Sequence, residues 1–375
     1  MKVILTGGGT GGHFFPALSI AEELQRRYPD IQLLYLGHDG YIESKVIPEK
    51  GIDFVHIPSR WMENFYGSVF FRGKEIILAS TNMAAGLIKA RRVIKKFKPD
   101  FVIGTGGFVS FPVIIAAEQM GIKCYIHEQN AAPGRGNKMF AKKARKIFAG
   151  FPGTEDTLGY AEKTIYVGNP VREEFKNIDK EKSRETLGVD KDDFLVFTVG
   201  GSLGSETLND VAFEYAKRIK ERENCALICS TGSELYDRYV EKAKAEGINL
   251  GEKIRLEGFI KDIKSCIGAA DLVVCRAGAM SIAELLVAGR PSIIIPYTGS
   301  VGNHQYYNAK SVYDAGGALF YEEKDMTPAL ICDKIEELEK DRARLEEMGK
   351  ACLKIAPSNS ASIICDEIIA DYEKN

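Results

Sequence analysis

The sequence predicts an α/β protein built from two Rossmann-like, doubly wound domains that face a central cleft. The glycine-rich turn Thr6–His13 directly follows the apolar segment Lys2–Leu5. A second glycine-rich turn, Gly200–Ser205, follows Phe194–Val199 a domain's length later. A strand, a glycine turn and a helix N-terminus together direct backbone amides toward a phosphate. Two such units therefore indicate two similar domains with a substrate held between them.

The first domain alternates strand and helix patterns, which is typical of a parallel sheet covered by helices on both faces. The expected strands are Lys2–Leu5, Ile31–Leu36, Asp100–Ile103 and Cys124–His127. Ligands in such sheets bind beyond the carboxyl ends of the strands. We therefore expect three polar or glycine-rich segments to share one edge of this sheet: Gly7–His13, Gly104–Gly107 and His127–Asn130.

The same pattern restarts near Phe194, after a segment with turn chemistry at Gly168–Arg172. Its expected strands are Phe194–Val199, Ala226–Cys229, Leu272–Cys275 and Ser292–Pro296. We predict an N-terminal domain at 1–168 and a C-terminal domain at 169–355. Residues 356–375 are expected to form a helix that packs back on the first domain.

Bulk composition is typical of a soluble globular protein. The 375 residues are 45% hydrophobic and 27% charged, and the formal net charge of -2 gives no reason to expect a nucleic-acid partner. The eight cysteines show no metal-ligand spacing, so reduced core thiols and a cytoplasmic setting are expected. No signal peptide and no membrane-spanning apolar run is recognisable.

The first glycine turn contains Gly7-x-Gly9-x-x-Gly12, which fits a dinucleotide fingerprint. The acidic residue expected after the second strand is replaced by Leu36-Gly37-His38, which argues against a nicotinamide cofactor. His13 opens the next helix, where the helix N-terminus favours a neutral imidazole able to accept a proton. It is a candidate general base or substrate contact, although a simple helix-capping role is the alternative.

In the second domain, Arg276–Glu284 follows a strand and opens a helix whose first amides suit a pyrophosphate. Glu284 lies about one turn further on, where its carboxylate can accept bonds from two sugar hydroxyls or merely complement the helix dipole. Gly302–Asn308 is interpreted as a loop rich in neutral hydrogen-bonding groups that suit a hexose and its N-acetyl group. Its alternative is an ordinary polar surface loop. Two weaker candidates are Ser202, for a polar contact, and Ile260, for contact with a nucleotide base.

Taken together, these motifs resemble the bacterial N-acetylglucosaminyltransferases that complete the lipid-linked precursor of peptidoglycan. The resemblance covers essentially the whole chain and rests on Gly8–His13, Gly104–Ser110, His127–Asn130, Gly168–Arg172, Gly200–Ser202 and Arg276–Ala279. The combination of His127-Glu128-Gln129-Asn130 with the first glycine turn is its most specific part.

The resemblance implies a two-domain glycosyltransferase of the GT-B architecture that inverts the anomeric carbon. Residues 1–168 would form the domain that faces the acceptor and the membrane, and residues 169–355 the domain that binds the UDP-sugar. It would transfer N-acetylglucosamine from UDP-N-acetylglucosamine to the C4 hydroxyl of undecaprenyl-pyrophosphoryl-N-acetylmuramyl-pentapeptide, converting lipid I to lipid II. His13 would be the base. The residues implied to contact the sugar nucleotide are Thr10, Gly11, Gly12, Asn130, Arg172, Ser202, Ile260, Ala279, Met280, Ser281, Glu284 and Gln305. No cofactor and no metal is implied.

Three positions depart from the family pattern. Ser281 stands where threonine is common and keeps the hydroxyl. His304 replaces one glutamine of a pair and keeps a hydrogen bond. Leu203 removes one polar contact near the second glycine turn.

A lipid-linked acceptor implies docking on the anionic cytoplasmic face of the cell membrane, as a peripheral protein. Basic residues near apolar ones suit such a surface. One basic set comprises Lys89, Arg91, Arg92, Lys95, Lys96 and Lys98, and another comprises Arg135, Lys138, Lys142, Lys143, Arg145 and Lys146. The aromatic segment Trp61–Phe71 could insert shallowly. The alternative is that these are solvated helix faces and a loop packed on its own domain.

Three other functions stay open from the sequence. A related glycosyltransferase could act on another lipid such as diacylglycerol. A UDP-sugar epimerase could share the two-domain fold without needing a lipid surface. A non-catalytic UDP-sugar-binding module would bind the nucleotide without turnover.

Overall fold

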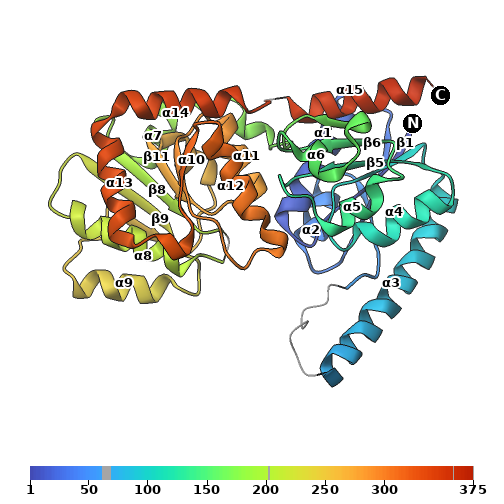
Figure 1. Ribbon diagram of the computed structural model, residues 1–375, viewed down its shortest axis with the longest axis horizontal. Helices are drawn as coiled ribbons and strands as arrows, with labels where there is room; N and C mark the ends of the chain where they lie inside the picture. The colour runs from blue at the N-terminus through green and yellow to red at the C-terminus, as the bar shows by residue number, and fades with distance from the viewer. Residues whose placement is uncertain (61–68, 202, 358, 375) are drawn as a thin grey trace. The chain divides into compact units, whose positions relative to one another are not determined.

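The computed structural model describes residues 1–60, 69–201, 203–357 and 359–374, with side chains left aside at 69–76 and 301. The chain divides into two compact units (Figure 1). The N-terminal unit comprises Met1–Val171 and Asn359–Asn375, and the C-terminal unit comprises Arg172–Ser358. The boundary therefore falls within the predicted Gly168–Arg172 turn segment.

The N-terminal unit is built on a seven-stranded parallel sheet in the order β3-β2-β1-β4-β5-β6-β7. Its strands are β1 (Lys2–Thr6), β2 (Gln32–Gly37), β3 (Asp53–His56), β4 (Phe101–Gly104), β5 (Lys123–Glu128), β6 (Lys146–Ala149) and β7 (Thr164–Tyr166). Val3, Ile4 and Leu5 of β1 are all fully buried, because helices cover both faces of the strand. This explains why the central strands appear as continuous apolar runs.

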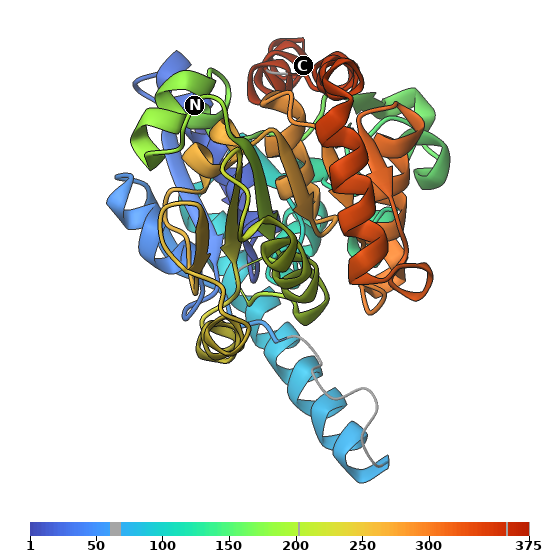
Figure 2. The ribbon, with the colours of Figure 1, turned by 90° about the vertical axis from the view of Figure 1, so that its left-hand side faces the viewer.

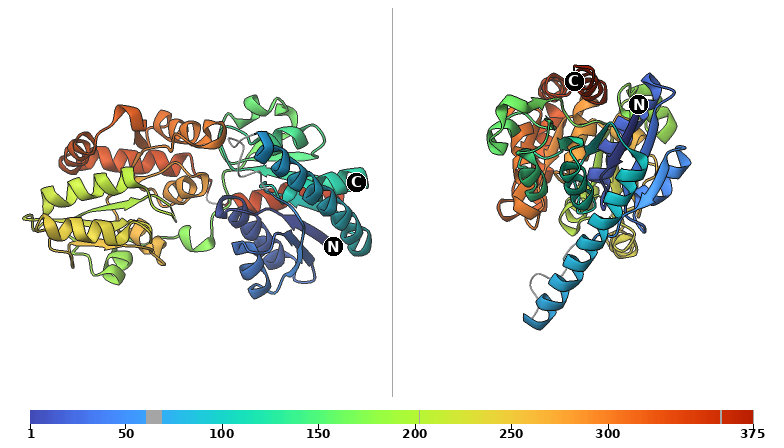
Figure 3. Two further views of the ribbon diagram at one scale, coloured as in Figure 1. Left: turned by 90° about the horizontal axis from the view of Figure 1, so that it is seen from below. Right: turned by 90° about the vertical axis from the view of Figure 1, so that its right-hand side faces the viewer.

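Two sets of helices cover the two faces of this sheet. The first set packs with Val3 and Leu5 and consists of α1 (Gly11–Arg27), α2 (Ile42–Glu49) and the C-terminal α15 (Ser360–Glu373). The second packs with Ile4 and consists of α3 (Val69–Phe97), α4 (Ser110–Gln119), α5 (Arg135–Ala141) and α6 (Thr154–Leu158). Figure 2 and the right-hand view of Figure 3 show α3 projecting beyond the sheet of its own unit.

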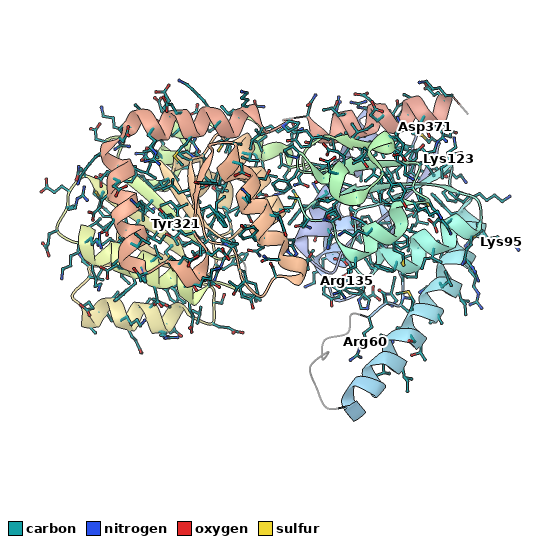
Figure 4. All side chains as sticks on the ribbon, viewed as in Figure 1. Arg60, Lys95, Lys123, Arg135, Tyr321 and Asp371 are labelled. Atoms are coloured by element: carbon teal, nitrogen blue, oxygen red, sulfur yellow. The ribbon has the colours of Figure 1, made fainter. Side chains whose placement is uncertain are left out.

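The C-terminal helix α15 is fixed to the N-terminal unit by polar bonds as well as by apolar packing. Tyr125 donates to the Asp371 carboxylate at 2.7 Å, and Arg145 pairs with the same carboxylate at 2.8 Å. The hydrogen bonds from Arg145 and Tyr125 lower the pKa of Asp371. The charge of Lys123, which Figure 4 labels beside Asp371, lowers it by a smaller amount. Lys146 pairs with Glu367 at 2.6 Å.

Ion pairs engage half of the second basic set, which comprises Arg135, Lys138, Lys142, Lys143, Arg145 and Lys146. Arg145 and Lys146 are paired with α15, and Lys143 is 3.3 Å from Glu118 of α4. The sequence shows no acid within this run, but the fold brings carboxylates to it from α4 and α15. Lys143 and Arg145 are paired although they are exposed, whereas Arg135, Lys138 and Lys142 are exposed members of the set outside these three ion pairs.

The C-terminal unit repeats the plan with a six-stranded parallel sheet in the order β10-β9-β8-β11-β12-β13. Its strands are β8 (Phe194–Val199), β9 (Cys225–Ser230), β10 (Ile254–Glu257), β11 (Leu272–Cys275), β12 (Ser292–Ile294) and β13 (Ala318–Phe320). Its helices are α7 (Lys180–Leu187), α8 (Glu206–Ile219), α9 (Tyr236–Ala245), α10 (Ile263–Ala269), α11 (Ala279–Val287), α12 (His304–Asp314), α13 (Pro328–Lys340) and α14 (Arg342–Lys354). The predicted α/β class with two parallel-sheet domains is confirmed.

All eight cysteines are buried with free thiols, as expected for core positions. Burial raises the pKa of several of them, such as Cys229 to about 12, so these thiols stay protonated. Within the described ranges, no helix is long and apolar enough to cross a membrane.

Candidate functional site

The first glycine turn connects β1 to α1, and Thr10 in extended conformation is the N-cap. Two side chains hold the turn from outside. The Tyr35 hydroxyl donates to the Gly7 carbonyl at 2.6 Å, and the Gly9 amide donates to Glu43 Oε1 at 3.1 Å. Glu43 is fully buried, which raises the pKa of its carboxyl. The sequence does not single out either residue. Glu43, in particular, comes from α2 and not from the end of β2.

The second glycine segment, after β4, is pressed against the first turn. Gly107 has φ +80°, and a Cβ there would lie 2.2 Å from the Gly8 carbonyl oxygen. A Cβ on Gly106 would lie 2.9 Å from Nδ1 of His13. These glycines therefore let two backbone turns and an imidazole share one small space.

His13 is the third residue of α1, and its ring is fixed through one nitrogen. Nδ1 lies 3.1 Å from the Thr105 carbonyl and 2.9 Å from Gln129 Oε1. The Thr105 hydroxyl also donates to the His13 carbonyl at 2.7 Å. Among the described residues, no hydrogen-bond partner is found for the other ring nitrogen, Nε2.

Behind His13, the buried residues His127 and Gln129 are bonded to each other. Gln129 Nε2 lies 2.8 Å from His127 Nδ1 and 3.1 Å from the His127 carbonyl. His127 Nε2 lies 3.2 Å from the Gly168 carbonyl. Burial is the main cause that lowers the pKa of His127 to about 4. The hydrogen bond to Gly168 raises this pKa, and the neighbouring His13 lowers it further.

Glu128 and Asn130, from the same motif, organise the loop after β5. Glu128 Oε1 accepts from the Asn130 amide at 2.9 Å, and Oε2 accepts from the Gly134 amide at 2.9 Å and from Asn137 Nδ2 at 2.8 Å. Since its oxygens are engaged by backbone and side-chain N–H groups, Glu128 acts as a loop anchor. It places Asn130 at the carboxyl end of β5, near the His13 cluster.

The buried His127 gives unfolding a specific pH dependence. In the unfolded chain the His127 imidazole takes up a second ring proton near pH 6.5, whereas in the folded chain it does so only near pH 4. Because the unfolded chain binds more protons between these values, the free energy of unfolding falls as the pH drops through that window. Between pH 7.5 and 5, this group alone should remove about 2 kcal/mol, and above pH 7.5 its effect should vanish. Urea unfolding of wild type and His127→Asn should show the extra loss only in wild type. Equal losses in the two proteins would contradict the buried, neutral state of His127.

In the C-terminal unit, α11 begins at Ala279 with Gly278 as an extended N-cap. The amides of Ala279, Met280 and Ser281 belong to the first turn, where N–H groups lack intrahelical acceptors. Ala279 and Met280 have buried side chains, whereas Ser281 is exposed. This turn is therefore suited to an anion.

Glu284 lies further along α11 and is paired with Arg172. Its Oε1 is 3.2 Å from Arg172 Nη2, while Arg172 Nη1 is 2.8 Å from Glu174. The Arg172 guanidinium also stacks on Phe175, 4.6 Å from the ring centre. Burial raises the pKa of Glu284, and Arg172 opposes that rise.

The interpretation of Gly302–Asn308 as a loop is wrong for most of its length. Asn303 adopts φ +56°, and α12 starts immediately afterwards at His304. The helix forms because Asn308, Ala309 and Val312 share a buried face. The polar residues predicted to lie in a loop are therefore part of this helix from His304 onward. Gln305 Oε1 accepts from the Tyr297 amide at 2.9 Å and from the Ala277 amide at 3.2 Å. Its carbonyl thus joins two turns of the unit.

A further network, not recognised from the sequence, surrounds Arg276. Its Nη2 lies 2.8 Å from Ser205 Oγ and 2.5 Å from Glu323 Oε1, and Glu323 also accepts from Thr207 at 2.9 Å. The bond to Ser205 connects the turn after β11 to the turn after β8, and the ion pair connects the turn after β11 to a distant 3-10 turn (Glu323–Asp325). No local sequence pattern could indicate this partner.

Two candidates remain less defined. Ser202 lies outside the described residues. Ile260 is 8% exposed, whereas its neighbour Phe259 is 59% exposed. Leu203, the departure noted above, is 82% exposed. In the described part of the chain, no group of three His, Cys, Asp or Glu residues could hold a metal ion.

Residues 3–149 match the glycosyltransferase family 28 N-terminal domain, and residues 195–363 match the family 28 C-terminal domain. A UDP-N-acetylglucosamine--N-acetylmuramyl-(pentapeptide) pyrophosphoryl-undecaprenol N-acetylglucosamine transferase of Acetivibrio thermocellus is 36% identical over 375 residues, which is 100% of this chain and 99% of that protein. The chain belongs to glycosyltransferase family 28.

Two solved structures share the fold of this chain. The crystal structure of Acinetobacter baumannii MurG is similar with a TM-score of 0.75 at 26% identity, covering 98% of this chain and 99% of that one. A UDP-GlcNAc 2-epimerase from Neisseria meningitidis, solved with UDP-GlcNAc, has a TM-score of 0.70 at 14% identity, covering 99% of this chain and 100% of that one. The second likeness concerns the fold alone.

Proposed function

We propose that this family 28 chain transfers N-acetylglucosamine from UDP-N-acetylglucosamine to the C4 hydroxyl of undecaprenyl-pyrophosphoryl-N-acetylmuramyl-pentapeptide, which is the conversion of lipid I to lipid II. The observation that carries the proposal is the full-length similarity to a transferase of that name. The arrangement around His13 supports it, because a histidine held through Nδ1 leaves Nε2 for the attacking hydroxyl.

Residues of both units take part in the proposed reaction. In the N-terminal unit, Nε2 of His13 takes the proton of the C4 hydroxyl as its oxygen attacks the anomeric carbon. Thr10, Gly11, Gly12 and Asn130 contact the sugar nucleotide. The bond to the diphosphate breaks with its electron pair leaving on UDP, so a single displacement inverts the anomeric carbon.

In the C-terminal unit, the first amides of α11 (Ala279–Val287) stabilise the charge that develops on the diphosphate. Glu284 holds the ribose hydroxyls, and Arg172 neutralises this buried carboxylate. Ser202, Ile260, Ser281 and Gln305 complete the sugar-nucleotide contacts.

Acceptor choice is tested by a transfer assay. Labelled UDP-N-acetylglucosamine is incubated with a short-chain polyprenyl-pyrophosphoryl-N-acetylmuramyl-pentapeptide or with diacylglycerol. The proposal expects label in the muramyl lipid and none in diacylglycerol. Transfer to diacylglycerol would replace the proposed acceptor, and UDP-sugar binding without any transfer would leave only a sugar-nucleotide-binding module.

We also propose that the protein docks peripherally on an anionic cytoplasmic membrane surface through α3 (Val69–Phe97). Ile77 and Ile88 are 64% and 49% exposed, and Arg92, Lys95 and Lys96 are exposed further along the helix. Ile77, Ile88, Arg92 and Lys95 follow helical spacing on one face, and Figure 4 shows Lys95 on the outer side of α3. The aromatic segment Trp61–Phe71 lies outside the described residues, except for the helix backbone from Val69.

The docking proposal predicts a change in vesicle binding without a change in chemistry. Replacing Arg92, Lys95 and Lys96 by Gln removes about 1 kcal/mol each and should weaken binding to anionic vesicles roughly 100-fold. Transfer to a short-chain, water-soluble acceptor should stay at the wild-type rate. A matched triple, Lys244→Gln, Lys261→Gln and Lys340→Gln in the C-terminal unit, should bind vesicles as wild type does. Equal weakening in both triples would place the contact elsewhere.

A further inference from the structure

The hydrogen bonds between His127, Gln129 and His13 have a defined direction. The starting point is the Gly168 carbonyl, which can only accept. His127 Nε2, 3.2 Å away, must therefore carry the proton. Because His127 is fully buried and stays neutral, its Nδ1 is left with a lone pair.

Gln129 transmits this direction to His13. The side-chain nitrogen of Gln129 faces two acceptors, Nδ1 of His127 at 2.8 Å and the His127 carbonyl at 3.1 Å. Both of its protons are used there, so the amide cannot be flipped without opposing two acceptors with an oxygen. The Gln129 oxygen consequently points at His13.

His13 is the last residue in this series of hydrogen bonds. Its Nδ1 faces two oxygens, Gln129 Oε1 at 2.9 Å and the Thr105 carbonyl at 3.1 Å. Neither oxygen can donate, so Nδ1 carries the proton of the neutral ring. The lone pair then lies on Nε2.

We propose that Gln129 and His127 are positioning residues that hold His13 in its Nδ1-protonated tautomer and so present Nε2 as the proton acceptor. The inference rests on the proposed function for its catalytic meaning, but the tautomer itself does not. When Nε2 takes the proton of the attacking hydroxyl, the Nδ1 proton stays in place. The two oxygens facing Nδ1 then stabilise the imidazolium, and no proton passes along the amide.

The tautomers can be read without substrate. In protein labelled with ¹⁵N-histidine, long-range ¹H–¹⁵N correlations distinguish protonated from unprotonated ring nitrogens, and the chain has only five histidines. His13→Gln and His127→Asn assign the two spin systems. We expect opposite tautomers: protonated Nδ1 in His13 and protonated Nε2 in His127. A protonated Nε2 in His13, or an even mixture, would overturn the proposal whether or not the protein transfers sugar.

The role of Gln129 is tested by two variants and one control. Gln129→Leu removes the amide, and Gln129→Glu keeps its size while removing the protons that His127 accepts. The folded Gln129→Leu variant should shift His13 toward a tautomer mixture and lower kcat about 10-fold with KM for the acceptor unchanged. Gln129→Glu still offers an acceptor oxygen to Nδ1 of His13, so His13 should keep its tautomer there while His127 loses the donor to its Nδ1. Asn169→Ala removes a 3.0 Å bond to the Gln129 backbone carbonyl but leaves the side-chain amide, so the His13 tautomer should be retained. A wild-type His13 tautomer and a wild-type rate in Gln129→Leu would refute the positioning role.

Discussion

Replacing His13 by glutamine should lower kcat for sugar transfer by roughly 10²–10⁴-fold, the usual contribution of a general base. Glutamine keeps a polar side chain beside Thr105 and Gln129, so the surrounding hydrogen bonds can persist. The amide cannot take up the proton of the acceptor hydroxyl. Steady-state kinetics with a short-chain acceptor would measure the loss.

The same kinetics separate two roles for His13. If His13 instead bound the pyrophosphate of the acceptor, KM for the acceptor would rise while kcat at saturation stayed near the wild-type value. Affinity for UDP-N-acetylglucosamine, measured by calorimetry, should remain within about two-fold in either case. A variant with wild-type kcat would exclude His13 as the base.

Replacing Glu284 by alanine should weaken UDP binding by about 1.5–3 kcal/mol, which is roughly 10- to 150-fold. The reason is the loss of a buried, charged acceptor for ribose hydroxyls. The decisive comparison is between UDP and 2′- or 3′-deoxy-UDP. Wild type should prefer UDP over at least one deoxy analogue, and Glu284→Ala should lose that preference.

Glu174→Ala is the matched control for this prediction. It also removes a carboxylate from Arg172, since Glu174 is 2.8 Å from that guanidinium, but Glu174 is the more exposed partner. UDP affinity should change by no more than about two-fold, because an exposed ion pair contributes little. Retained discrimination between UDP and the deoxy analogues in Glu284→Ala would show that Glu284 does not hold the ribose.

The central strands could be predicted because burial on both faces makes them continuous apolar runs. Phe194–Val199 coincides with β8, and Leu272–Cys275 coincides with β11. The strands without a sequence prediction include β3 (Asp53–His56) and β7 (Thr164–Tyr166), which are short, lie at the sheet edges and are only partly buried. Their patterns are too brief and too polar to stand out from loops.

The geometry around the candidate site could be predicted best where backbone shape dictates the residue. The first glycine turn and His13 follow directly from a strand, a tight turn and a helix N-terminus. Glu43 and Glu323 were not predicted because each comes from an element whose proximity only the tertiary fold creates. The orientation of the Gln129 amide likewise depends on a tertiary contact, because the Gly168 carbonyl fixes the proton of His127 and His127 fixes the amide. His304–Asn308 was misinterpreted because its polar residues obscure the buried helical face.

The proposed conversion is tested most directly by the structure of its product. Wild-type protein is incubated with UDP-N-acetylglucosamine and the short-chain muramyl acceptor, and the products are analysed by NMR. The account predicts UDP and one glycolipid in which N-acetylglucosamine is attached to C4 of the muramyl residue with inverted anomeric configuration. Retention of configuration would contradict the single displacement. Free or epimerised sugar without glycolipid would contradict the transferase assignment itself.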